Sequence, residues 1–318
     1  MHNIEGLVLK STGSWYDIYV EQTNQVLACR LAGKMKLNKS TLTNPVAVGD
    51  KVDIQVSENS DAIIQNIQPR KNYIARQSPK NKHQVHIIAS NIDQAVLITT
   101  LREPHFKQGF IDRFIMTTEP QDIPVLIIFN KADLYNDEDV EEYKELQRIY
   151  ESIGYSTLSI SCKSKLGIEA LKERLVSKIS LFSGQSGVGK SSIINELIPG
   201  LNQKTGLVSG YTGKGTHTTT FAEMLRGERD TFIIDTPGLK TLTFNNLEIL
   251  DVAHNFREFF EVSENCKFGR RCTHQDEPGC CVRERIENGQ LYFFRYRNYL
   301  SILEEIKAHN YWERKKDY

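Results

Sequence analysis

A glycine-rich loop at residues 184–191 has the residue types and the spacing that bind nucleotide phosphates. In such a loop the glycines allow backbone N–H groups to converge on phosphate oxygens at the start of a helix. We expect Lys190 to reach the β- and γ-phosphates and the hydroxyl of Ser191 to bind Mg²⁺, with Ser192 beside it. The loop matches the pattern G-x-x-x-x-G-K-S/T at every position, and its residues are Gly184, Gln185, Ser186, Gly187, Val188, Gly189, Lys190 and Ser191.

A second motif, Asn130-Lys131-Ala132-Asp133, could select the base of the nucleotide. It follows the apolar run 125–129 directly, and strands of a parallel sheet end at a ligand crevice. The Asp133 carboxylate can accept hydrogen bonds from N1–H and the exocyclic amine of guanine, a pair that adenine does not offer. We expect Asn130 to bond the base or the neighbouring loop and the Lys131 stem to pack on the ring. A third base-contacting loop is predicted at Ser161, Cys162 and Lys163.

The tetrad Asp235-Thr236-Pro237-Gly238 follows another strand-like run, at residues 231–234. Asp235 can hold Mg²⁺ through water, and the N–H of Gly238 can sense the γ-phosphate. Upstream, residues 210–220 are rich in glycine and hydroxyl side chains, which suits a loop that becomes ordered when GTP and Mg²⁺ bind. We expect one threonine of this loop to complete the metal coordination, Thr219 in preference to Thr218.

The residue after Gly238 is Leu239, which cannot orient an attacking water as the glutamine of many GTPases does. His217, two residues before Thr219, could orient or deprotonate that water near neutral pH. The alternative is that His217 only packs against its loop or RNA. The predicted catalytic residues are therefore His217, Lys190 and Thr219.

The order of these motifs is circularly permuted. An ordinary GTPase begins with the phosphate loop and ends with the base motifs, whereas here residues 130 and 161 precede residue 184. The sheet can keep the strand order of an ordinary GTPase if the N- and C-termini of that GTPase are joined and the chain is opened after the Asp-x-x-Gly motif. This motif then continues straight into the C-terminal region, so that motion at the γ-phosphate can be passed covalently to that region.

Four cysteines cluster with one histidine near the C-terminal end. Three thiolates and one imidazole suit tetrahedral Zn²⁺, and four protein ligands make a structural rather than a catalytic site. Cys281 adjoins Cys280 and is an alternative fourth ligand, and free thiols or a redox pair are the alternative to a metal. The predicted ligands are Cys266, Cys272, His274 and Cys280.

Short strand-like runs without a convincing helix occupy the first 75 residues, at 4–10, 15–20, 26–30, 51–56 and 62–67. They predict a small closed β-barrel, most commonly an OB-fold, with an SH3-like barrel as the alternative. Strands then alternate with amphipathic helices at 140–153 and 168–175, which favours a doubly wound parallel sheet. The predicted division is an OB-fold barrel at 1–75, a circularly permuted GTPase domain at 76–245 and a helical zinc-binding domain at 246–318.

The composition is that of an ordinary globular protein, with 318 residues, 39% hydrophobic and 25% charged. The formal net charge of +0 supplies no global attraction to nucleic acid or membrane, so any such attraction must be local. No stretch approaches the about 20 apolar residues that span a bilayer, and the N-terminus does not resemble a signal peptide. Because the cysteines cluster instead of spreading as a disulfide framework, we expect a reducing compartment, the cytoplasm.

Two segments without acidic residues, 22–49 and 62–92, could form basic RNA-binding surfaces. The alternative is that these charges are solvated faces and that the aromatic residues of the last helix, predicted near 291–306, are core. The basic residues of the two segments are Arg30, Lys34, Lys36, Lys39, Arg70, Lys71, Arg76, Lys80 and Lys82.

Together these motifs resemble the ribosome small-subunit-dependent GTPase A family of bacteria over essentially the whole chain. The resemblance implies an OB-fold, one bound zinc ion and a role in late maturation of the 30S subunit with contacts to 16S ribosomal RNA. It also implies weak GTP hydrolysis that the 30S particle stimulates. We expect the chain to act as a monomer. Competing interpretations are a permuted GTPase of the large subunit, an RNA-binding scaffold with a vestigial nucleotide site, and a P-loop kinase.

Overall fold

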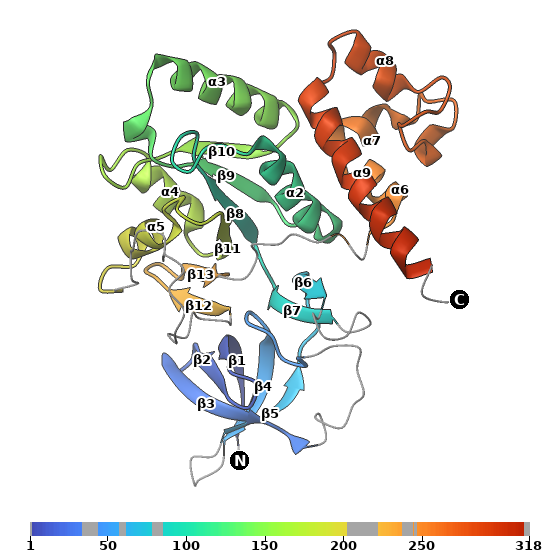
Figure 1. Ribbon diagram of the computed structural model, residues 1–318. Helices are drawn as coiled ribbons and strands as arrows, with labels where there is room; N and C mark the ends of the chain where they lie inside the picture. The colour runs from blue at the N-terminus through green and yellow to red at the C-terminus, as the bar shows by residue number, and fades with distance from the viewer. Residues whose placement is uncertain are drawn as a thin grey trace.

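The computed structural model describes residues 2–33, 44–56, 62–77, 85–201, 222–236, 244 and 247–314. A β-barrel forms one end of the molecule, a sheet flanked by helices forms the middle, and a helical unit packs beside that sheet (Figure 1). No helix in this described part of the chain is long and apolar enough to cross a bilayer.

The N-terminal barrel contains the five predicted strands. Strand β1 pairs with both β2 and β4, β3 pairs with β5, and β4 pairs with β5, which closes an OB-like barrel. Its interior is filled by inward-facing residues such as Val8, Ile18 and Ile54, all 0% exposed, because side chains alternate between the two faces of a strand. The strands are β1 (His2–Ser11), β2 (Tyr16–Val20), β3 (Gln25–Leu31), β4 (Lys51–Val56) and β5 (Ala62–Ile67).

A two-stranded sheet of β6 (Tyr73–Gln77) and β7 (Val85–Ser90) follows the barrel and was absent from the sequence-based prediction. Its sequence pattern is weak because Tyr73 and Ile74 are consecutive apolar residues and β6 ends in polar residues, so no apolar–polar alternation is visible. The predicted domain boundary at residue 75 lies within β6.

The central sheet has the order β10-β9-β8-β11-β13-β12, with only β12 antiparallel to its neighbour. Every residue of β8 and β9 is buried, as expected for parallel strands covered on both faces. The predicted doubly wound sheet is therefore confirmed. The strands are β8 (Gln94–Thr99), β9 (Val125–Phe129), β10 (Ser156–Ser159), β11 (Ile179–Gly184), β12 (Glu223–Arg226) and β13 (Phe232–Asp235).

Two hydrophobic clusters lie on opposite faces of this sheet. Helices α2 (Gln108–Thr118) and α3 (Asp137–Ser152) pack on one face, whereas α4 (Ile168–Leu175) and α5 (Lys190–Leu197) pack on the other. The helix α3 begins with a capping box, in which the Asn136 side chain accepts from the Asp139 N–H and the Asp139 side chain accepts from the Asn136 N–H. A 3₁₀ turn, η1 (Glu119–Gln121), follows α2.

The C-terminal unit packs on the α2 side of the sheet through its long last helix (Figure 1). Phe256, Phe259 and Tyr299 form its aromatic core and share one hydrophobic cluster with α2 and α3. Within the last helix, Tyr299 is buried in this core and Tyr296 packs against it, whereas Phe293 is 65% exposed, so the alternative interpretation holds for only part of this helix. The elements are α6 (Ile249–Asn255), α7 (Arg257–Ser263), η3 (Gly269–Arg271), α8 (Cys281–Glu287) and α9 (Phe293–Arg314).

The barrel and the central sheet are joined edge to edge. Strand β1 pairs antiparallel with β12, with Lys10 opposite Glu223, so the two units form one continuous eleven-stranded sheet. The short strand β12 carries only four residues and was not predicted, because its formation depends on neighbours from both units.

Candidate functional site

The predicted nucleotide motifs follow the carboxyl ends of four parallel strands. The phosphate loop leaves β11, Asn130 and Asp133 follow β9, Ser161 follows β10, and Asp235 ends β13. Because these strands are parallel, their carboxyl ends lie at one edge of the sheet, where ligands of such folds bind.

The phosphate loop is shaped by glycines that other residues could not replace. Gly187 and Gly189 have φ values of +85° and +94°, a region that residues with a Cβ rarely adopt. A Cβ on Gly189 would lie 2.3 Å from the Asn130 Nδ2 atom, and one on Gly184 would lie 2.5 Å from the Ile98 carbonyl oxygen. Gly189 precedes α5, so Lys190, Ser191 and Ser192 form the first turn of that helix.

Lys190 at the end of this loop forms an ion pair with Asp235 at the end of β13. The Nζ of Lys190 lies 2.5 Å from Oδ1 of Asp235, and both side chains are less than one-fifth exposed. Next to Asp235, the Thr236 hydroxyl donates to the Phe182 carbonyl and anchors the end of β13 on β11. The Asp235 carboxylate and the Ser191 hydroxyl are oxygen ligands of the kind that Mg²⁺ prefers.

Asn130 connects the base motif to the phosphate loop. Its Nδ2 donates to the Val188 carbonyl at 2.8 Å, although 58 residues separate the two in the chain. Its Oδ1 is buried and has no hydrogen-bond partner among the described residues. A buried acceptor without a donor is costly in a finished structure, so its position beside the phosphate loop fits a site completed by a ligand.

Ser161 holds the carboxylate of Asp133. The Ser161 hydroxyl donates to Asp133 Oδ1 at 2.6 Å, and the Lys163 Nζ lies 3.9 Å from Oδ2. Burial raises the pKa of the neighbouring Cys162 thiol to about 11, so this thiol stays protonated. The predicted third loop is therefore adjacent to the predicted base-reading carboxylate.

A loop after β8 also reaches this site and was missed by sequence reasoning. The Lys131 Nζ donates to the Glu103 carbonyl at 2.5 Å, and a Cβ on Gly187 would contact Pro104 at 3.6 Å. Behind Asn130, the Tyr135 hydroxyl donates to the Asn130 carbonyl. Residues 101–106 have no motif or periodicity that could have indicated this position.

Several predicted residues lie outside the described part of the chain, and nothing in the structure bears on them. They are His217, Thr219 and Gly238 of the nucleotide motifs, and Lys34, Lys36, Lys39, Lys80 and Lys82 of the basic segments.

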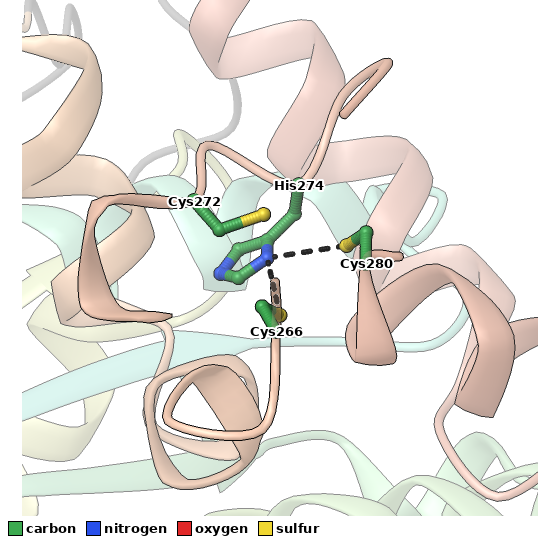
Figure 2. Close-up of side chains that lie close together, drawn as sticks. All are labelled: Cys266, Cys272, His274 and Cys280. Carbon is green, nitrogen blue, oxygen red and sulfur yellow. Dashed lines mark hydrogen bonds between the residues drawn. The ribbon is translucent and has the colours of Figure 1, made fainter. Parts of the chain in front are cut away.

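The four predicted metal ligands converge in the C-terminal unit. Figure 2 shows Cys266, Cys272, His274 and Cys280 pointing toward a common centre, and their ligand atoms all lie within 4.8 Å of one another. The His274 Nδ1 lies 3.8 Å from the Cys266 sulfur and 3.4 Å from the Cys280 sulfur. Tetrahedral Zn²⁺ separates such atoms by about 3.5 Å, given Zn–S and Zn–N bonds of about 2.3 and 2.0 Å. The buried cluster could therefore hold a metal ion.

Cys281 lies apart from this cluster. Its thiol donates to the Asn265 carbonyl at 2.8 Å, while its backbone N–H donates to the Cys266 sulfur at 3.3 Å. An N–H donor to a cysteine sulfur orients that sulfur as an outer-shell contact does in metal sites. The geometry therefore places Cys280, not Cys281, with the other three.

Helix α9 supports the cluster from behind. The Tyr296 hydroxyl donates to the His274 carbonyl at 2.7 Å, and the Tyr299 hydroxyl donates to the Thr273 carbonyl at 2.5 Å. Burial lowers the pKa of His274 to about 4 and raises that of Cys272 to about 12. Burial thus favours the neutral forms of both residues, and a bound cation is what would stabilise a thiolate here.

The predicted basic surfaces are only partly available. On the barrel, the Arg30 guanidinium lies 4.1 Å from the ring centroid of Trp15, which is 43% exposed. Arg70 instead donates to both carboxylate oxygens of the buried Asp50, so its charge is neutralised by an ion pair within the fold. Arg295 of the last helix, a basic residue outside the two predicted segments, is 1% exposed and also lies in the interior.

The sheet order, the phosphate loop after β11 and the Asn-Lys-x-Asp motif after β9 define a circularly permuted P-loop GTPase. Residues 67–245 match the protein family described as RsgA GTPase, and residues 5–64 match the RsgA N-terminal domain. The chain belongs to the RsgA GTPase family.

Named relatives agree with this assignment over almost the whole chain. The small ribosomal subunit biogenesis GTPase RsgA 2 of Bacteroides thetaiotaomicron is 44% identical over 97% of this chain and 99% of its own. The small ribosomal subunit biogenesis GTPase RsgA of Flavobacterium johnsoniae is 44% identical over 96% of this chain and 94% of its own. The crystal structure of YjeQ from Thermotoga maritima superposes with a TM-score of 0.80 at 32% identity, covering 96% of this chain and 99% of that one.

Proposed function

We propose that this chain hydrolyses GTP to GDP and phosphate on the small ribosomal subunit, as a step in late assembly of that 30S particle. The main support is the hydrogen bond from the Asn130 side-chain amide to the Val188 carbonyl, because this bond joins the guanine motif to the phosphate loop in one site. The names of the relatives, small ribosomal subunit biogenesis GTPases, support the choice of partner.

In this site the Asp133 carboxylate, oriented by Ser161, reads guanine, while Asn130 and the Lys131 stem hold the base. The backbone of the phosphate loop and Lys190 bind the phosphates, and Gly238 contacts the γ-phosphate. Mg²⁺, when bound, neutralises phosphate charge, and the residues that would hold it are Ser191, Thr219 and Asp235. The pairing of Lys190 with Asp235 supports this arrangement, because it brings the phosphate-binding lysine and a Mg²⁺-binding carboxylate within 2.5 Å of each other.

We assign orientation of the attacking water to His217. Leu239 stands where many GTPases carry a glutamine, so the water needs another polar partner. An imidazole in the loop that carries Thr219 could accept a proton from water near neutral pH. Together with Lys190 and Thr219, His217 completes the proposed catalytic set.

For the C-terminal cluster we propose one structural zinc ion held by Cys266, Cys272, His274 and Cys280. Three sulfur ligands and one nitrogen ligand favour zinc over the oxygen-preferring metals, and four protein ligands leave no open position for catalysis. The burial of the cluster and the position of the Cys281 thiol on the Asn265 carbonyl support this set.

We further propose that the chain binds 16S ribosomal RNA in the cytoplasm as a monomer, with no membrane partner. The division into a barrel at 1–75, a GTPase domain at 76–245 and a zinc-binding domain at 246–318 also remains a proposal. Arg30, stacked on the exposed ring of Trp15, supports an RNA-binding barrel, because aromatic rings with adjacent cations bind unpaired bases.

The decisive experiment measures phosphate release from GTP by the pure chain alone, with 30S subunits and with 50S subunits. Stimulation by 30S alone is the expected result, with Lys190→Ala as the inactive control. Stimulation by 50S alone would instead favour a large-subunit GTPase. An absence of hydrolysis under all three conditions would overturn the proposal and leave an RNA-binding scaffold.

A further inference from the structure

Four charged side chains form a row from the barrel to the phosphate loop. Lys10 of β1 lies opposite Glu223 of β12, and Glu223 lies opposite Asp235 of β13. The Lys10 Nζ is 3.0 Å from Glu223 Oε1, just as the Lys190 Nζ is 2.5 Å from Asp235 Oδ1. On its other side Lys10 lies opposite Asp17 of β2.

This row is held in place by further contacts between β12 and the barrel. The Arg226 guanidinium lies 4.3 Å from the ring centroid of Tyr19 and hydrogen-bonds Asn24. The same Tyr19 ring lies 6.1 Å from the Phe232 ring of β13. Strand β12, the neighbour of the Asp235 strand, is therefore fixed against the barrel at both of its ends.

The two central residues of the row, Glu223 and Asp235, lie directly opposite each other on neighbouring strands. Directly opposite residues of antiparallel strands point to the same face with Cβ atoms about 4.5–5.5 Å apart, and like charges there are unfavourable. In the proposed GTP-bound state Lys190 binds the phosphates, and Mg²⁺ lies at Asp235. Along the row from Asp235 toward the barrel, the first charged residue is then Glu223 and the second is Lys10. The negative charge of Glu223 attracts this cation, and the positive charge of Lys10 opposes the attraction.

We propose that Lys10 of the barrel and Glu223 of β12 are positioning residues that set the Mg²⁺ affinity of the nucleotide site with opposite signs. The inference rests on the proposed function, because it takes Asp235 as a Mg²⁺ residue. It makes the barrel an electrostatic part of the nucleotide site. A partner that moves the barrel away from β12 changes the Mg²⁺ affinity of that site.

The test is an equilibrium titration of Mg²⁺ with a fluorescent, non-hydrolysable GTP analogue bound to the full chain. Lys10→Gln should lower the Mg²⁺ concentration for half-maximal binding, and Glu223→Gln should raise it, each by about two- to fivefold for charges about one-third exposed. The double variant should lie within about twofold of the wild type, because the two effects oppose each other. Both shifts should shrink as salt rises, since exposed charges are screened over about 8–10 Å.

The matched control is Lys51→Gln, the same change at an exposed lysine on β4 of the same barrel. The swap Lys10→Glu with Glu223→Lys keeps the ion pair but puts a positive charge beside Asp235, so it should raise the Mg²⁺ requirement. If the ion pair had only a structural role, both single variants would shift the Mg²⁺ requirement in the same direction. The swap variant, which keeps the ion pair, would then have the Mg²⁺ requirement of the wild type.

Shifts of one sign in both single variants, or shifts no larger than that of Lys51→Gln, would overturn the inference alone. A wild-type chain that binds the GTP analogue at no Mg²⁺ concentration would overturn the proposed function and this inference with it. If a single variant unfolds, the swap variant decides between the two roles.

Discussion

Replacing Arg295 by methionine would leave two carboxylates buried without their cation. Arg295 of α9 donates from Nε and Nη2 to Glu258 of α7 at 2.7 and 3.0 Å, and from Nη1 to Asp112 of α2 at 2.5 Å. Asp112 is 0% exposed and also accepts from Tyr150 and Asn298. This cluster joins the C-terminal unit to the GTPase domain, so its loss acts on the contact between them.

The expected cost follows from the burial of all three charges. Removing one partner of a buried ion pair typically costs about 3–5 kcal/mol, because the remaining charge is desolvated without compensation. Methionine keeps most of the side-chain volume, so little of this cost comes from a cavity. We therefore expect Arg295→Met to lower the free energy of unfolding by about 3–5 kcal/mol near neutral pH.

The loss should depend on pH in a defined direction. Burial raises the pKa of Asp112, and Arg295 and hydrogen bonds from Asn298 and Tyr150 act against that rise. Without Arg295 the folded-state pKa rises further, while the unfolded chain keeps a pKa of about 3.9. Above that value the folded variant binds more protons than the unfolded chain, so its stability falls as pH rises through the folded pKa. The deficit relative to wild type should be larger at pH 8 than at pH 5.5.

The assay is denaturant unfolding followed by circular dichroism at both pH values. The control is Arg297→Met, two residues along the same helix at an exposed position, which should change stability by less than about 0.5 kcal/mol. Adding Asp112→Asn to Arg295→Met should recover part of the loss, since one buried charge is then removed. Equal and small losses in the Arg295 and Arg297 variants would contradict a stabilising role of the buried ion pairs, as would a deficit that does not grow with pH.

Three further predictions concern the proposed sites. Asp133→Asn should weaken GTP binding and favour xanthosine nucleotides, and unchanged GTP affinity in a competition assay would remove Asp133 from base reading. Elemental analysis should find about one zinc per chain, with most of it lost in Cys272→Ala and retained in Cys281→Ala; the reverse pattern would make Cys281 the ligand. His217→Ala should bind GTP and 30S subunits normally but lose most 30S-stimulated phosphate release, and wild-type turnover would move the water-orienting role elsewhere.

The chemistry of the short motifs can be inferred from consecutive residues, because each motif is contiguous. The phosphate loop needs glycines at its own positive-φ residues and a helix that begins within the motif, so neighbouring residues carry most of the information. The strand runs of the barrel and the central sheet were predictable for a similar reason, since burial on one or both faces leaves a pattern in consecutive residues. The cysteine spacing likewise indicated a metal cluster.

The contacts that join these parts could not be read in the same way. Asn130 meets Val188 across 58 residues, Arg295 meets Asp112 across 183, and Lys10 meets Glu223 across 213. The strand β12 and the loop at Glu103 have no periodicity of their own, because their positions come from neighbours in space. Local sequence carries backbone preference and residue chemistry. The partner of each of these side chains depends on how strands and helices far apart in the chain pack against one another.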